Sequence, residues 1–172
     1  MQIALMQSAR VLSNFRVVSR QQISAPVVAA PLRSRSRSLT TTTMASARVV
    51  VSTDQAPGAV GPYSQAIKAG GMVYVSGQVA LVPGTKDFAA EDVGGQTEQV
   101  MKNLEAILKE AGSDFGKVVK CTILLADMAD FGVVNEIYGK RFPVDPPARA
   151  TFAVKGLPLG ALVEIDCVAI AE

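Results

Sequence analysis

The 172-residue sequence lacks histidine altogether and has only two cysteines. Without an imidazole, the chain cannot use Ser-His-Asp or Cys-His catalysis, and histidine is excluded as a metal ligand and as an acid–base group. Cys121 and Cys167 lie far apart, each inside an apolar run. This placement favours buried thiols in a reducing compartment over a disulfide scaffold or a metal site.

Acidic residues are absent from the first 53 positions, which carry seven arginines and no lysine. This segment is also rich in serine and threonine, as in the run from Ser34 to Thr43. Such a composition is typical of an organellar transit peptide, and residues 3–20 can form a helix with most of its arginines opposite the apolar side. We therefore predict a disordered transit peptide over residues 1–45 and a folded domain over residues 46–172.

Other interpretations of the leader remain open. A basic tail without a targeting role is one alternative, whereas a secretory signal fits poorly because arginines interrupt every long apolar stretch. Cleavage is expected between Ser38 and Ser46, and Met44 as an internal start would give an untargeted form. No stretch approaches the roughly 20 apolar residues of a membrane span, so no membrane partner is expected.

The rest of the chain has the opposite charge. From Asp54 onward, 15 acidic residues outnumber 10 basic ones, which gives a net charge of −5 although the whole chain carries +2. A surface that follows nucleic-acid phosphates needs a basic stripe. A nucleic-acid partner is therefore disfavoured.

The hydrophobic pattern after residue 47 predicts strands alternating with two helices. Gly70-Gly71 has the spacing of a two-residue hairpin loop whose turn needs positive φ. The expected strands cover residues 48–53, 63–68, 72–76 with a possible extension over 79–82, 118–125, 149–154 and 162–171.

The first helix is expected over Glu91–Ala111, with acidic residues at its start and Gly112 as its stop. A second helix follows Asp127, includes Arg141 and ends at Pro143, and its expected buried stripe is Phe131, Val134 and Tyr138.

This order of elements predicts an α+β fold, in which two helices cover one face of a mixed sheet. The other face then needs cover, which half-apolar strands would find in an oligomer. The residues expected on that face are Val163, Ile165, Cys167 and Ala169.

Two charged residues in the late strands are candidates for catalysis. Arg149 follows Pro146-Pro147-Ala148, which gives its side chain a defined direction, and its planar fork matches a carboxylate. Glu164 lies in the middle of a strand, either on a solvated face or in a lined cavity. A structural salt bridge between the two is the alternative.

Weaker candidates are Asn135, Tyr63 and the strand end Ser76-Gly77-Gln78. Asn135 lies at the edge of an apolar stripe, where a tertiary hydrogen bond to backbone is its expected role. Turn geometry alone accounts for Gly77 at this level.

Taken together, several spaced segments resemble the RidA/YjgF family over about residues 49–172. The late segments are Pro147-Ala-Arg-Ala-Thr-Phe-Ala-Val-Lys-Gly-Leu-Pro and Val163-Glu-Ile165. The earlier ones, in the same order as in the family, are Ala56-Pro57, Gly61-Pro62-Tyr63-Ser-Gln, Val75-Ser-Gly-Gln78, Asp130-Phe131 and Val134-Asn135 with Tyr138.

The resemblance implies a chorismate-mutase-like homotrimer with sites between subunits. It also implies cofactor-free and metal-free hydrolysis of 2-imino acids, chiefly 2-iminobutanoate and 2-iminopropanoate, released by pyridoxal-phosphate enzymes. By position, Arg149 would hold the substrate carboxylate, and Glu164, expected to stay ionised beside a guanidinium, would act on water or the imine nitrogen. Tyr63, Ser76, Gly77, Asn135 and Thr151 would line the pocket, some from a neighbouring subunit. Many bacterial members have Cys where this chain has Thr151, so no catalytic thiol is expected there.

Two other functions remain in view. One is a non-catalytic ligand-binding or chaperone-like trimer, and the other is an endoribonuclease or translation inhibitor, which the negative charge disfavours. Plant members of the family and the Ser/Thr-rich leader favour a chloroplast location. The helix expected over residues 3–20 keeps the mitochondrial matrix as the alternative.

Overall fold

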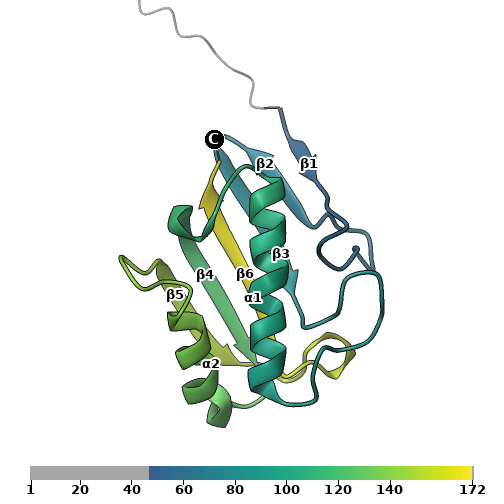
Figure 1. Cartoon of the computed structure of the whole chain (residues 1–172), viewed down its shortest axis with the longest axis vertical. Helices are drawn as coiled ribbons and strands as arrows, with labels where there is room; N and C mark the ends of the chain where they lie inside the picture. Colours follow the sequence, from purple (N-terminus) through teal and green to yellow (C-terminus); the bar gives the residue numbers. More distant parts are fainter. Residues whose placement is uncertain (1–46, 172) are drawn as a thin grey trace, which may run out of the picture. The chain divides into compact units, whose positions relative to one another are not determined.

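The computed structural model describes residues 47–171, so the transit peptide expected over 1–45 lies outside the described residues (Figure 1). The described residues form one six-stranded mixed sheet in the order β1-β2-β3-β6-β4-β5, and only the pair β4–β5 is parallel. The strands are β1 (Val49–Val51), β2 (Ala66–Ala69), β3 (Met72–Gln78), β4 (Val118–Leu125), β5 (Ala148–Ala153) and β6 (Val163–Ile170).

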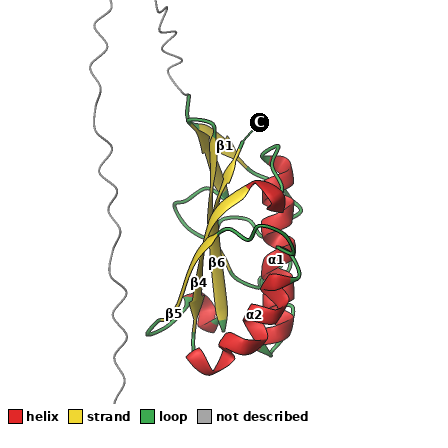
Figure 2. Ribbon diagram, turned by 90° about the vertical axis from the view of Figure 1, so that its left-hand side faces the viewer, coloured by secondary structure: helices red, strands yellow, loops and turns green. Residues whose placement is uncertain are grey.

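Two α-helices, α1 (Val93–Glu110) and α2 (Phe131–Gly139), lie on the same face of this sheet. Figure 2 shows the sheet edge-on, with both helices on one side. The predicted α+β layout is confirmed. Within residues 47–171, neither helix has the length and apolar character needed to cross a membrane.

The hairpin between β2 and β3 forms at the predicted glycines. Ala69 pairs with Met72, and Gly70 and Gly71 both adopt positive φ, at 61° and 76°. Glycine has no Cβ to oppose this conformation. The expected extension over 79–82 does not form, because Ala80 and Val82 bond instead with the following loop around residues 87–89.

Helix α1 begins and ends through local capping. The Asp92 side chain accepts a hydrogen bond from the Gly95 amide at 2.9 Å, so the helix starts at Val93 rather than at the predicted Glu91. At the other end Gly112 has φ of 74°, and the Ser113 amide donates to the Leu108 carbonyl, which closes a Schellman motif. One face of α1 is buried, with the apolar residues Val100, Leu104, Ile107 and Leu108 at its centre.

Helix α2 is shorter than predicted. Asp127 caps a 3₁₀ turn before the helix, and the helix ends at Gly139, so Arg141 and Pro143 lie beyond it. Arg141 pairs there with Glu98 and Glu105. Of the expected buried stripe, Val134 and Tyr138 are buried, but Phe131 is 37% exposed and Ile137 takes its place in the interior.

The prediction for the two faces of β6 is wrong. Val163, Ile165, Cys167 and Ala169 belong to the core beneath the helices rather than to an open face. The predicted alternation along the strand is correct, but the residues predicted for the open face are those that face the helices. The exposed apolar residues on the open face come from four strands, with exposures of 48–54%: Val50, Tyr74, Phe152 and Ile170.

Candidate functional site

Arg149 and Glu164 lie on opposite faces of the sheet. Arg149 is the strand partner of Cys121, whose side chain is buried beneath the helices. Glu164 is the partner of Leu124, three positions further along β4, where side chains point the other way. No ion pair among the described residues involves either charge. A salt bridge between them within one chain, the alternative from sequence, is wrong.

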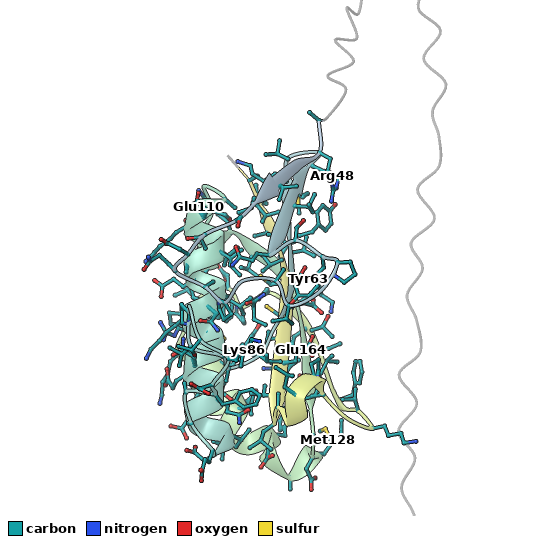
Figure 3. The ribbon with its side chains drawn as sticks, turned by 90° about the vertical axis from the view of Figure 1, so that its right-hand side faces the viewer. Arg48, Tyr63, Lys86, Glu110, Met128 and Glu164 are labelled. Atoms are coloured by element: carbon teal, nitrogen blue, oxygen red, sulfur yellow. The ribbon has the colours of Figure 1, made fainter. Side chains whose placement is uncertain are left out.

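Glu164 opens into a cleft of about 260 Å³, here called the Glu164 cleft. Three further predicted residues, Tyr63, Ser76 and Gly77, line it together with Glu164. Figure 3 labels Tyr63, on the loop before β2, and Glu164, on β6. The remaining lining is largely apolar: Pro57, Gly58, Val60, Gln78, Val79, Leu81, Pro158 and Leu159.

Gly77 is required by a close approach, not by a turn. It lies within β3, where the pairing with β6 shifts register between Val75 and Gln78. A Cβ at Gly77 would overlap Oε1 of Glu164, and Gly77 is not among the positive-φ residues. The turn explanation from sequence is therefore wrong. The glycine leaves the space in which the carboxylate lies.

The surroundings of Glu164 oppose its charge. Partial burial raises the pKa of the Glu164 carboxyl, and the negative charge of Asp166, on the same face of β6, raises it further. In the single chain no guanidinium lies beside it, so the condition under which Glu164 was expected to stay ionised is not met. Glu164 can therefore take up and release a proton closer to neutral pH than an exposed glutamate can.

Tyr63 and Ser76 each have part of their hydrogen-bonding capacity engaged. The Tyr63 hydroxyl oxygen accepts from the Val60 amide at 3.3 Å, which leaves its own O–H able to donate to a ligand. The Ser76 hydroxyl donates to the Ser64 carbonyl at 2.7 Å, which leaves its oxygen able to accept. The cleft thus offers both a donor and an acceptor beside Glu164.

Buried amide side chains hold the walls of this cleft. Gln65 donates to the carbonyls of Thr53, Ala56 and Pro57 and accepts from the Thr53 amide, which fixes the loop before β2. Asn103, on α1, donates to the carbonyls of Val79 and Leu81. Sequence reasoning missed these roles, because a polar residue within an apolar pattern does not show which backbone groups it satisfies.

Arg149 borders a second groove, here called the Arg149 cleft. Its other lining residues are Asn135, Tyr138, Gly139, Phe142, Pro146 and Pro147. The guanidinium carbon lies 4.9 Å from the centroid of the Tyr138 ring and 5.8 Å from that of the Phe131 ring. Aromatic faces therefore hold this cation.

The remaining predicted residues, Asn135 and Thr151, also lie on this side of the domain. Asn135 is exposed and makes no side-chain hydrogen bond within residues 47–171, so the predicted tertiary bond is wrong. The Thr151 hydroxyl is buried without a hydrogen-bond partner and does not line the Arg149 cleft.

The two cysteines are direct strand partners beneath the helices. Cys121 on β4 pairs with Cys167 on β6, and both thiols are free and buried. Burial raises the pKa of both thiols, and the charge of Asp166 adds to this effect. The predicted buried thiols are confirmed. No cluster of three or more potential metal-binding side chains occurs among the residues described here.

A protein-family model described as Endoribonuclease L-PSP matches residues 53–171. The chain is 58% identical over 120 residues to Reactive Intermediate Deaminase A, chloroplastic, of Arabidopsis thaliana, covering 70% of this chain and 64% of the relative. It is 50% identical to the 2-iminobutanoate/2-iminopropanoate deaminase of Mus musculus over 72% of this chain and 91% of that relative.

A solved structure has the same fold. The crystal structure of a putative endoribonuclease L-PSP from Entamoeba histolytica matches with a TM-score of 0.70 and 54% identity, covering 72% of this chain and 99% of that one. The two proteins therefore agree in sequence as well as in fold, over nearly the full length of the Entamoeba protein. The chain therefore belongs to the RidA/YjgF/L-PSP family.

Proposed function

We propose that this chain is a 2-imino acid deaminase. It would hydrolyse 2-iminobutanoate and 2-iminopropanoate, which pyridoxal-phosphate enzymes release, to the 2-oxo acid and ammonia. The observation that carries this proposal is that one chain holds both Glu164, whose pKa is raised in a small cleft, and Arg149, which has no carboxylate partner among the described residues. The names of the Arabidopsis and mouse relatives support the same reaction.

Arg149 would bind the substrate carboxylate. Arg149 is an exposed residue whose guanidinium lies on ring faces and in no ion pair of the described residues, so the N–H edges are available for two parallel hydrogen bonds. Hydrogen bonds to a charged partner contribute about 1.5–3 kcal/mol each. This contact fixes the position of the imine carbon, and orientation alone supplies a large part of the acceleration for a reaction that already proceeds in water.

Glu164 would move the protons. Its carboxylate takes a proton from water as the water oxygen bonds to the carbon of the protonated imine, and the electron pair of the C=N bond moves to nitrogen to give a neutral amino alcohol. The acid then gives that proton to the amino nitrogen, the C–N bond breaks with its electron pair leaving on ammonia, and the hydroxyl proton passes to this ammonia as the carbonyl forms. Water and the protonated imine are thus converted to oxo acid and ammonium with no other reactant. A raised pKa suits both steps.

The complete site would require two copies of the chain. Because Arg149 and Glu164 lie on opposite faces, we propose that Arg149 of one subunit meets Glu164 of its neighbour in a chorismate-mutase-like homotrimer. The exposed apolar residues on the open face of the sheet offer the surface for assembly. In that assembly, the guanidinium of the neighbouring subunit would lower the pKa of Glu164 again, although the two residues do not pair within one chain.

The proposal extends to the leader. Residues 1–45 would act as a transit peptide for the domain over 46–172, and the chloroplastic Arabidopsis relative favours the chloroplast over the mitochondrial matrix. Fusion of residues 1–45 to a fluorescent protein separates these destinations. A diffuse signal from that fusion would contradict the targeting role.

Ribonuclease activity is the alternative that the family description raises. The net charge of −5 after residue 53 and the lack of histidine count against it. A non-catalytic binding or chaperone-like trimer is the other alternative. A chaperone role would survive the removal of Arg149.

The test is deamination by the full chain of an imine generated in situ by a threonine dehydratase. We expect faster appearance of 2-oxobutanoate with the wild type and no acceleration with Arg149→Ala at unchanged oligomeric state. No acceleration by folded wild-type protein would overturn the proposal for these substrates. Cleavage of RNA by the wild type, lost in neither Arg149→Ala nor Glu164→Gln, would favour a different site and function.

A further inference from the structure

Arg149 lies against aromatic rings, whereas surface arginines commonly pair with carboxylates. Its guanidinium carbon lies 4.9 Å from the Tyr138 ring centroid, close enough for a cation–π interaction. The Phe131 ring is more distant, at 5.8 Å. None of the ion pairs formed within the described part of the chain includes Arg149.

Tyr138 is a rigid support. It is only 4% exposed, and its ring packs on Phe142 with centroids 4.6 Å apart. Phe142 in turn packs edge-on against Phe115 at 5.3 Å. Three rings, from α2, the segment after it and the turn before β4, thus fix the plane beneath Arg149.

The Tyr138 hydroxyl cannot reach a ligand. Its oxygen is buried and has no well-formed hydrogen bond, although it lies beside the Cys121 thiol. Burial and that thiol raise the pKa of Tyr138, so the phenol stays neutral at physiological pH. A role in proton transfer is excluded because the group does not meet the substrate. What Tyr138 presents to Arg149 is the face of its ring.

We propose that Tyr138 is a positioning residue, whose ring holds the Arg149 guanidinium in the orientation that receives the substrate carboxylate. The inference rests on the proposed function of Arg149. A carboxylate in this place would pair with the N–H edges and compete with the substrate. A ring attracts the cation through its π face and leaves those edges available. Tyr138 thus orders the side chain without neutralising it.

The kinetic test compares Tyr138→Phe, which keeps the ring, with Tyr138→Leu, which removes it, in the full chain. We expect Tyr138→Leu to raise KM for the imine about tenfold, equivalent to about 1.4 kcal/mol, with kcat changed less than about twofold, since the lost contact acts equally on ground and transition states. Tyr138→Phe should remain within about twofold of the wild type. Ile137→Ala, a buried change on the same helix outside the Arg149 cleft, is the control and should leave KM unchanged.

Replacement of Tyr138 by pentafluorophenylalanine keeps an aromatic shape and reverses the charge of the ring face. It therefore covers the case in which Tyr138→Leu does not fold. We expect KM to rise as in Tyr138→Leu. A KM equal to that of Tyr138→Phe would overturn the proposal, as would an equal rise in KM in Ile137→Ala, which would indicate a merely structural role.

Nuclear magnetic resonance gives a readout independent of catalysis. The Arg149 Nε–H signal, identified by its loss in Arg149→Lys, should be shifted upfield by the ring in the wild type and in Tyr138→Phe, and should return to the ordinary position in Tyr138→Leu. An unshifted wild-type signal would overturn the positioning role. If the wild type lacks deaminase activity while this signal behaves as expected, the proposed reaction fails and the support of Arg149 by Tyr138 stands.

Discussion

The two clefts of this domain hold their charged residues by different physical means. In the Glu164 cleft, the carboxylate lies in space left by Gly77, while buried amides such as Gln65 fix the walls. In the Arg149 cleft, an exposed guanidinium lies on aromatic faces. The first environment opposes the charge of its residue, and the second orients a charge without pairing it.

This difference suits the separate tasks proposed for the two residues. An acid–base group works best when its pKa is near the working pH, and partial burial moves the pKa of Glu164 in that direction. A carboxylate-binding cation works best when it is ordered but unpaired. Placing the two on opposite faces of the sheet prevents their mutual neutralisation within one chain, and in the proposed function only assembly would bring them together.

The largest effect is expected from mixing two inactive variants. Arg149→Ala and Glu164→Gln should each lower kcat/KM by at least about 10²-fold. Suppose that each site takes Arg149 from one subunit and Glu164 from the next. Refolding an equimolar mixture of the two variants should then restore about a quarter of the wild-type activity, because that fraction of sites receives both intact residues. The measurement is the rate of imine hydrolysis before and after the two variants are refolded together.

The control for this experiment is a mixture of Arg149→Ala with Arg149→Lys, which should show no recovery above the average of its components. Failure of the first mixture to recover, although mass spectrometry shows mixed oligomers, would mean that the two clefts do not form a shared site.

The next effect concerns the space beside Glu164. Gly77→Ala should lower kcat by roughly 10- to 100-fold, because the new Cβ displaces the carboxylate by about an ångström. Gly58→Ala, in the lining of the same cleft with no atom near its added Cβ, is the matched control and should retain activity. Equal activity of the two variants in a steady-state assay would show that the position of Glu164 is not critical.

Removal of the amide that fixes the loop should affect stability more than chemistry. Gln65→Leu leaves the carbonyls of Thr53, Ala56 and Pro57 without their donor and should lower the free energy of unfolding by about 1–3 kcal/mol. Gln55→Leu, an exposed change in the same loop, should stay within about 0.5 kcal/mol. Urea denaturation measures both. Similar unfolding midpoints for the two variants would show that Gln65 does not stabilise the walls of the Glu164 cleft.

The smallest effect is the pH dependence of stability that Glu164 causes. Its pKa is higher in the folded than in the unfolded state, so the folded form binds the proton more strongly and wild-type stability falls as pH rises above about 4.3, the unfolded value. Glu164→Gln should therefore be more stable at pH 7, by less than about 1 kcal/mol after solvent screening, and no different at pH 3.

This comparison should be made in an Arg149→Ala background, which removes the cation that the proposed assembly would bring beside Glu164. Glu91→Gln, at an exposed position, is the control and should show no such pH-dependent gain in thermal melting. A stability difference for Glu164→Gln that persists at pH 3 would have another origin than the carboxyl charge.

Much of the fold could be predicted because its signals are local. The strand over Val118–Leu125 has the predicted bounds, and the Gly70-Gly71 turn and the Gly112 helix stop follow from short-range geometry. The predicted end of α2 is wrong. The helix ends at Gly139, four residues before Pro143, because a proline sets the furthest point that a helix can reach but does not make the helix continue to it.

The site was only half predictable. The residue types and the family resemblance identified Arg149 and Glu164, and the structure brings Tyr63, Ser76 and Gly77 together with Glu164. Tyr138 was expected only as part of a core stripe. Its contact with Arg149 arises because β5 runs beside β4 under α2, which no spacing along the chain reveals.

The sequence by itself determined the elements of this protein, the absence of imidazole chemistry, and the pair of charged residues available for catalysis. The tertiary structure alone decided which face of each strand meets the helices. In β6, the side of the strand that carries Glu164 and Asp166 also carries the apolar residues Val168 and Ile170. Because both sides contain apolar residues, the alternation shows which residues share a side but not which side faces the helices. The pairing register places Glu164 on the face opposite to Arg149, because a shift of one residue along a strand turns every side chain to the other face.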